Sequence, residues 1–220
     1  MKLPQSIVDL LYSTVYLPAF DRPYYHLDGY MLRHWVLGDR SPERNADHPH
    51  WHGRRGGWLY RLLTRHVAIR AHTILRSDHD RALHDHPWWS ISIVLKGGYW
   101  EVGEPTQACH DAPEMYELVL RELPWFDRRK PLAHQVARRY NIHWRGPGSV
   151  VWRRARSAHR LVLPHCDGTL HAPTAARTLF VMGRKSHDWG FYPQPFRRGH
   201  KVPWRQYLGL PLSGEEGGSA

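Results

Sequence analysis

The sequence predicts a mainly β fold, arranged as a sandwich or a barrel. Short runs rich in Val, Ile, Thr and aromatic residues recur along the chain, and turns that contain Gly or Pro separate them. This pattern favours an all-β architecture over alternating strands and helices. At 220 residues, the chain has the length of one well-buried domain with added elements.

Residues 1–66 are predicted to form an N-terminal extension that packs on this domain. Apolar residues near helical spacing predict a short helix over residues 4–16. A hairpin is expected over residues 24–37, because an Asp-Gly pair separates two strand-like runs. Residues 38–57 are polar and rich in Gly and Pro, so we expect a surface loop, with the histidines of HPHWH at 48–52 in solvent.

The main domain is predicted over residues 67–210, followed by a flexible tail at 211–220. Its expected strands cover residues 67–76, 88–95, 99–102, 149–153, 159–163 and 178–183. Lys96-Gly97-Gly98 should form a tight reversal that joins the second of these strands to the third, since glycine reaches positive φ without steric cost.

Residues 103–143 are expected to be an insertion, because a connection of this length usually carries its own structure. Helices are predicted within it over residues 114–122 and 132–140.

Composition restricts the function classes. The net charge is +11 and only five of the 31 basic residues are lysines, a balance that suits anionic substrates or nucleic acid, or that reflects a solvated basic surface. Two cysteines without metal-ligand spacing argue against a disulfide scaffold or a zinc ribbon. We find neither a signal peptide nor a run long enough to span a bilayer, so we expect a soluble cytoplasmic protein without membrane contact.

His84 and His86 are the strongest candidates for chemistry. They lie one residue apart at the entrance of a predicted strand, where alternation points both imidazoles to one side and Asp85 to the other. Two such ligands and one more nitrogen would form a facial metal site with open positions. His159 is the best candidate for the third ligand.

The chain resembles the cupin superfamily, whose fold is a double-stranded β-helix barrel of the jelly-roll type. The family's first motif places Gly, five residues, His-x-His, three or four residues, Glu, six residues and Gly. The matching positions in this chain are Asp78, His84, His86, Ser90 and Gly97. The spacing holds, while Asp78 and Ser90 depart from the family's residue types.

The second motif of the family runs Gly, five residues, Pro-x-Gly, two residues, His, three residues and Asn. The matching positions here are Gly148, Arg154, Arg156, His159 and Leu163. Again the spacing holds while three residue types differ. The stretches RSDHDRALHDHPW, KGGYWE and DWGFYP are similar to those of small bacterial and phage-type cupin-domain proteins whose activity is unassigned.

The resemblance implies a three-histidine metal site made of His84, His86 and His159. Ser90 stands where a typical metal-binding cupin has its glutamate ligand, and serine binds divalent ions poorly. Imidazole ligands alone suit a divalent transition metal, with Fe as the first choice and Zn or Ni as alternatives. Three-histidine iron sites resemble those of thiol dioxygenases. Asp78 is a candidate to orient an imidazole from just outside the ligands.

Glu101 could supply a carboxylate to this site. A two-residue reversal at Lys96-Gly97 would pair it with Ile93, whereas a reversal longer by one residue would place it on the face of Ser90. The sequence leaves open whether Glu101 is a catalytic acid/base or ligand, or a plain surface carboxylate.

Arginines surround the motif positions and could bind a small anionic molecule. We predict substrate contacts from Arg76, Arg154 and Arg156, which would clamp a carboxylate or phosphate beside the metal. The alternative is that these side chains point outward and pair with acidic residues.

Together these features predict a metal-binding cupin, most simply an oxygenase-type enzyme with a small anionic substrate. A cupin isomerase or epimerase of sugars or sugar nucleotides is one alternative, with His72, Tyr99 and Glu101 as loose candidates for acid/base chemistry. A non-catalytic module that binds a ligand or nucleic acid is the other, although no recognised nucleic-acid motif favours it. By analogy with cupins, the N-terminal hairpin could also form a homodimer.

Overall fold

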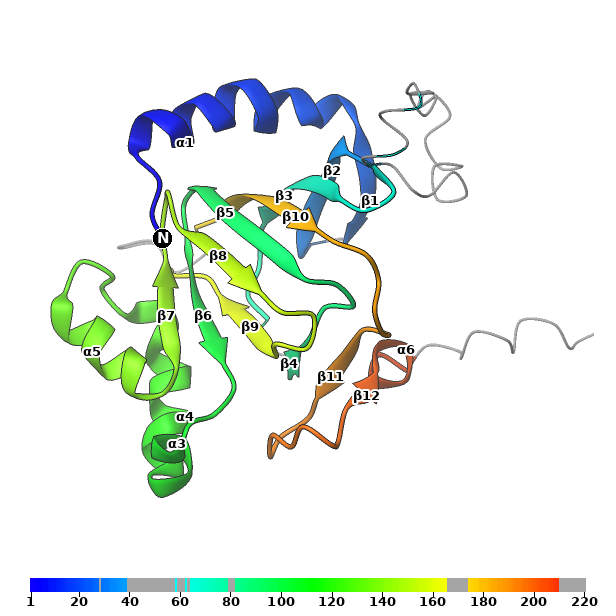
Figure 1. The fold of residues 1–220 in the computed structure, drawn as a ribbon. Helices are drawn as coiled ribbons and strands as arrows, with labels where there is room; N and C mark the ends of the chain where they lie inside the picture. The colour runs from blue at the N-terminus through cyan, green and yellow to red at the C-terminus, as the bar shows by residue number, and fades with distance from the viewer. Residues whose placement is uncertain are drawn as a thin grey trace, which may run out of the picture.

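The computed structural model describes residues 1–27, 29–38, 58, 62, 64–78, 82–165 and 174–209. Within these residues the strands form two six-stranded antiparallel sheets that face each other, as Figure 1 shows. No helix of this part of the chain is long and apolar enough to cross a membrane. The predictions for residues 39–57 and for the tail at 211–220 lie outside the described residues.

The first sheet contains the predicted N-terminal hairpin. Its strands, in spatial order, are β1 (Pro23–Leu27), β2 (Met31–Leu37), β3 (Ala68–Ile74), β10 (Ala176–Met182), β5 (Ser90–Lys96) and β8 (Val150–Arg153). Because β2 pairs with β3 along its whole length, the hairpin extends the sheet. Along β5, Ser90 and Ser92 are buried while Ile91 and Ile93 are half-buried on the opposite face.

The second sheet carries most of the residues of the candidate site. Its strands, in spatial order, are β12 (Val202–Pro203), β11 (Gly190–Tyr192), β4 (Leu83–His84), β9 (His159–Val162), β6 (Tyr99–Gly103) and β7 (Ile142–Arg145). The edge strands β7 and β8 are consecutive in the chain but belong to different sheets, so the chain crosses from one sheet to the other between them (Figure 1).

The predicted pairing of the strands on either side of Lys96–Gly98 is wrong. β5 and β6 lie in different sheets, and β6 pairs with β7 and β9. Gly97 and Gly98 have φ values of +67° and +150°, and these conformations carry the chain from one sheet to the other. Neither of the registers considered for Glu101 therefore exists.

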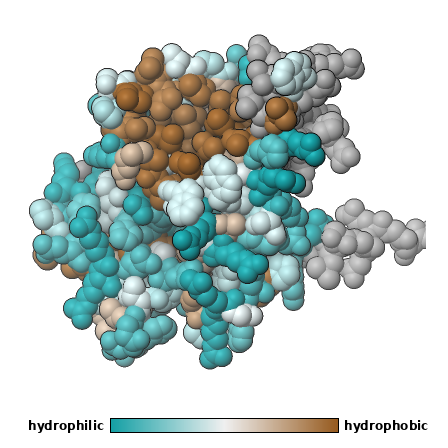
Figure 2. Space-filling view, in the orientation of Figure 1, coloured by the Kyte–Doolittle hydropathy of each residue, from teal (hydrophilic) through white to brown (hydrophobic). Residues whose placement is uncertain are grey.

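Helices cover the outer faces of both sheets. The predicted N-terminal helix is present as α1 (Gln5–Leu11), which continues through a π-helical turn (Tyr12–Tyr16) and a 3₁₀ turn (Leu17–Asp21). Val8 and Tyr16 pack from it onto Ala71 and Leu95 of the first sheet. Figure 2 shows apolar side chains gathered over this part of the molecule.

The predicted insertion is helical and covers the second sheet. It contains α3 (Gln107–Asp111), α4 (Pro113–Glu122), a 3₁₀ turn (Leu123–Trp125) and α5 (Pro131–Arg139), and a short α6 (Trp204–Tyr207) lies near the C-terminus. The helices bury Trp100, Val102 and Ile142 on the outer face of the sheet. Because Trp100 and Val102 of β6 face the helices, Glu101 between them points to the inner face of the sheet.

Candidate functional site

Three histidine side chains meet between the sheets. β4 ends in His84 and β9 begins with His159, and these two residues are direct cross-strand partners. His86 follows two residues after His84. The ring centroids are between 4.9 and 5.4 Å apart, and one nitrogen of each ring lies within 4.8 Å of the others. The structure thus brings the three predicted ligands together.

Burial favours the neutral form of two of these imidazoles, those of His86 and His159. Desolvation lowers the pKa of His86 well below its usual value, and the neighbouring charge of His159 adds to this. Desolvation and the guanidinium of Arg153 likewise lower the pKa of His159. The Nδ1 of His159 lies 3.3 Å from the carbonyl oxygen of Ser157, to which it can donate, so that Nε2 keeps its lone pair.

This donor set fits a divalent transition metal. Three imidazole nitrogens at close range match the ligand preference of Fe, Zn and Ni, and a three-ligand set leaves coordination positions for substrate. Among the residues that the structure describes, these three histidines are the one group of His, Cys, Asp or Glu whose ligand atoms converge in this way.

Asp78 and Ser90 are both buried near this group but differ in their contacts. The carboxylate of Asp78 accepts hydrogen bonds from the hydroxyl of Tyr30 at 2.5 Å and from the backbone N–H of Leu161 at 2.9 Å. Its bonds thus support strand β9, two residues after His159, and not an imidazole ring as the sequence suggested. Ser90 lies opposite Arg153 across the β5–β8 pair.

Glu101 joins the two sheets through two arginines. Its carboxylate accepts hydrogen bonds from Nε of Arg145, at 2.7 Å, and from Nε of Arg153, at 2.5 Å. Arg153 also donates to the hydroxyls of Ser92, at 2.8 Å, and Tyr99, at 3.4 Å. Since Arg153 is on β8 and Glu101 on β6, this buried ion pair connects one sheet to the other.

The charges of this network fix its protonation. Burial alone would raise the pKa of Glu101, but Arg153 and Arg145 outweigh burial and lower it, so the carboxylate is ionised at neutral pH. Burial raises the pKa of Tyr99, which keeps its phenol protonated. The network therefore holds two guanidinium charges against one carboxylate.

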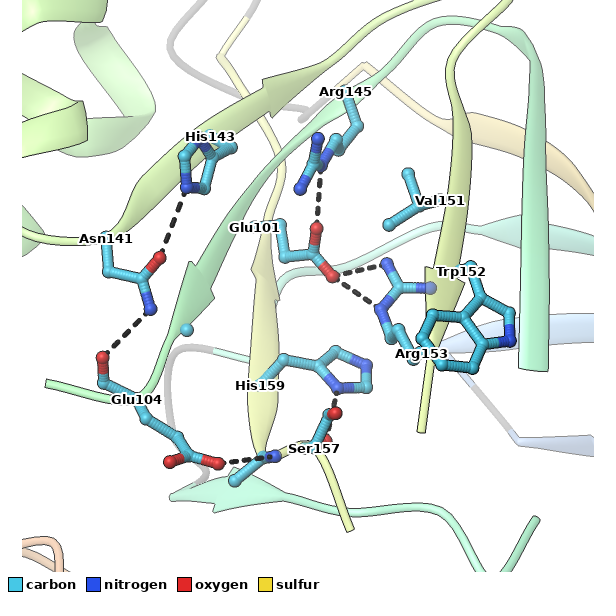
Figure 3. Close-up of a pocket in the computed structure, with 12 residues that line it drawn as sticks. Glu101, Glu104, Asn141, His143, Arg145, Val151, Trp152, Arg153, Ser157 and His159 are labelled. Atoms are coloured by element: carbon cyan, nitrogen blue, oxygen red, sulfur yellow. Dashed lines mark hydrogen bonds and ion pairs between the residues drawn. The ribbon is translucent and has the colours of Figure 1, made fainter. Parts of the chain in front are cut away.

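A cleft of about 310 Å³ borders this network, and of its charged groups Arg145 is the one that is partly exposed (Figure 3). His159, Glu101, Arg153 and Arg145 line it, together with the half-exposed Trp152 at its rim. The cleft thus places one of the three histidines and two arginines around the same space.

The structure puts the predicted substrate-binding arginines elsewhere. Arg76, Arg154 and Arg156 are exposed and do not line the cleft. Arg154 lies over the ring of Trp152, 5.8 Å from its centroid. Alternation in β8 explains the difference, because Arg153 faces inward and the residues after it leave the strand.

Arg145 and Arg153 line the cleft, and neither was among the arginines predicted to contact a substrate. The alternation of Val151 and Arg153 could have identified Arg153, since both side chains are buried on one face of β8. Arg145 carries no such signal, because its place depends on the pairing of β6 with β7.

Comparisons with known proteins add structural neighbours only. No protein-family model matches the sequence, and no curated protein matches it. Solved structures that are similar include a cupin 2 conserved barrel domain protein from Rhodopseudomonas palustris, at 9% identity, covering 79% of this chain and 77% of that one, with a TM-score of 0.38.

The polyketide cyclase RemF from Streptomyces resistomycificus is another, at 12% identity, covering 75% of each chain, with a TM-score of 0.37. A DMSP lyase from Ruegeria pomeroyi, at 12% identity and a TM-score of 0.33, is matched over 59% of this chain and 45% of its own length. The two facing antiparallel sheets, with the histidines held between them, form a double-stranded β-helix. The chain therefore has the fold of the cupin superfamily.

Proposed function

We propose that the protein is a metal-dependent enzyme of the oxygenase type that acts on a small anionic molecule. The observation that carries this proposal is the convergence of three histidine nitrogens within 4.8 Å, beside a cleft that contains two arginines. Such a site offers a metal its ligands and a substrate its counter-charge in one place.

Iron is the first choice of metal, with zinc and nickel as alternatives. Neutral imidazoles suit all three ions, and the absence of a carboxylate among the three converging ligands makes manganese a poorer match. The ligand count resembles that of three-histidine iron sites in thiol dioxygenases, which favours iron. When bound, ferrous iron supplies the redox and Lewis-acid chemistry of an oxygenase.

The charge of the cleft supports an anionic substrate. Arg153 is buried and shares its donors among Glu101, Ser92 and Tyr99. Arg145 is partly exposed and uses only its Nε for Glu101, so its two terminal nitrogens can clamp a carboxylate or phosphate. Glu104, which also lines the cleft, is paired with Arg198, so one positive charge among Glu101, Arg145 and Arg153 remains uncompensated and attracts an anion toward His159.

Glu101 suits a positioning role better than proton transfer. Two guanidinium groups keep it ionised, so it is a weak base and holds both arginines in place. The phenol of Tyr99 stays protonated and accepts a hydrogen bond from Arg153, so it also helps to hold this arginine in place.

Oxygen uptake tests the proposal. The protein is loaded with Fe²⁺ without air and then mixed with aerated buffer and a panel of small carboxylic acids with or without thiol and hydroxyl groups. We expect iron-dependent O2 consumption with at least one acid, loss of it in His159→Ala, and a raised KM with a smaller change in kcat in Arg145→Met. No consumption by a protein that holds one equivalent of iron would overturn the oxygenase assignment.

A further inference from the structure

We infer that the segment 186–204, here called the C-terminal strap, holds the metal-binding histidines in position, with Asp85 and Lys201 as positioning residues. The inference rests on the proposed function in one respect, namely that His84 and His86 bind a metal. In the second sheet, β11 of the strap lies directly beside β4, and β12 lies beyond β11 at the edge (Figure 1).

The strand that carries the histidines cannot fix them alone. β4 has only two residues, Leu83 and His84. His84 has cross-strand partners on both sides, His159 in β9 and Phe191 in β11. His86 lies beyond the end of β4 and has no strand partner. Another part of the chain must therefore define where His86 sits.

The strap fixes the residues on both sides of His86. The backbone N–H of Asp85 donates to the carbonyl of Gly190, and the N–H of Gly190 donates to Oδ1 of Asp85, both at 3.1 Å. On the other side, the carbonyl of Pro87 accepts from the backbone N–H of Ser186 at 2.7 Å and from its hydroxyl at 3.0 Å. His86 is thus held between two clamped neighbours.

The carboxylate of Asp85 is the centre of this attachment. It is fully buried, and its Oδ2 accepts hydrogen bonds from Lys201 at 2.7 Å, His187 at 3.1 Å and Tyr192 at 3.0 Å. A buried carboxylate needs a compensating charge, and the ammonium group of Lys201 provides it. Removing Lys201 would leave Asp85 uncompensated and loosen the strap.

The strap also packs directly on a predicted ligand. The rings of Phe191 and Trp189 lie 5.7 and 6.1 Å from the ring of His84, centroid to centroid. Phe191 is itself stacked on Tyr207, and Trp189 on Trp204. Loosening the strap would therefore change both the ring orientation of His84 and the backbone position of His86.

Metal affinity of suitable variants tests this inference. Zn²⁺ affinity is measured by competition with a chromophoric chelator for the wild type, Lys201→Met, Asp85→Asn and the double variant. The control is Lys185→Met, which removes an exposed ion pair to Asp188 without touching Asp85. Far-UV circular dichroism and the thermal midpoint of the metal-free proteins report the fold separately.

We expect one Zn²⁺ per chain in the wild type, and an affinity about tenfold or more lower in Lys201→Met, as for other residues that support metal ligands. The double variant should recover part of this loss, because it removes the uncompensated charge. The visible spectrum of the Co²⁺-loaded protein should change in Lys201→Met but not in Lys185→Met.

Equal Zn²⁺ affinities in wild type, Lys201→Met and Asp85→Asn would overturn the inference and leave the proposed function intact. A wild type that binds no metal would instead overturn the proposed function and the inference with it. Should Lys201→Met fail to fold, Tyr192→Phe removes one hydrogen bond to Asp85 while keeping the ring. The inference then requires Tyr192→Phe to weaken Zn²⁺ binding, and an unchanged affinity would contradict it.

Discussion

Replacement of Arg153 by methionine should destabilise the fold by breaking the ion pair that joins the two sheets. Arg153 is 6% exposed and Glu101 is also 6% exposed, so the carboxylate would lose its main partner inside the protein. Breaking a buried pair by removing one partner costs about 3–5 kcal/mol. Because Arg145 still contacts Glu101, we expect the lower value, about 3 kcal/mol.

Urea unfolding followed by tryptophan fluorescence measures this loss. A destabilisation of about 3 kcal/mol corresponds to a decrease of roughly 1 M in the urea midpoint if the slope is about 3 kcal/mol/M. The double variant with Glu101→Gln should regain part of the stability, because it removes the uncompensated charge. An Arg153→Met protein within about 1 kcal/mol of the wild type would refute the argument that this pair matters to the fold.

Further predictions concern pH and backbone conformation. The two arginines lower the pKa of Glu101 in the folded state below its value in the unfolded chain. The ionised carboxylate therefore stabilises the fold at pH values above its unfolded-state pKa, and this stabilisation is lost as the pH falls through its folded-state pKa. The unfolding free energy of Arg153→Met should therefore fall less steeply at acid pH than that of the wild type. The same pH dependence in both proteins would contradict this expectation. Burial lowers the pKa of His34 to about 4, so this residue by itself should reduce the unfolding free energy by at most about 3 kcal/mol between pH 6.5 and 4. His34→Phe should remove this part of the decrease, and an unchanged pH dependence would contradict it. Gly97→Ala places a Cβ 2.2 Å from the carbonyl oxygen of Ala175, whereas Gly29→Ala meets nothing within 4 Å at a similar φ. Both variants should lose about 1–2 kcal/mol of unfolding free energy because alanine is strained at a positive φ. In the same urea assay, Gly97→Ala should lose clearly more because of the clash, and equal losses in the two variants would contradict this.

Local patterns in the sequence predict much of the fold. The Asp-Gly pair identifies the β1–β2 hairpin, and helical spacing identifies α1, α4 and α5. Residues close together in the chain determine these elements, so a single sequence is enough to predict them. The reversal at Lys96–Gly98 is different, because a glycine turn between adjacent strands and one between facing sheets look alike in sequence.

The same division applies to the candidate site. The family spacing identifies His84, His86 and His159, and alternation predicts that Asp85 points away from them, as its bonds to the strap confirm. The role of Asp85 could not be predicted, because its partner Lys201 is 116 residues away in the chain. Arg145 likewise reaches the cleft only through the pairing of β6 with β7.

Metal analysis tests the central claim most directly. Protein purified without a histidine tag is compared with His84→Ala, His159→Ala and the control His143→Ala, which removes a histidine of the same cleft that lies outside the three-histidine group. With the fold verified by circular dichroism, we expect one equivalent of metal in the wild type and the control, and none in the other two variants. A folded wild type that binds no transition metal, even after reconstitution with Fe²⁺, Zn²⁺ or Ni²⁺, would contradict the account.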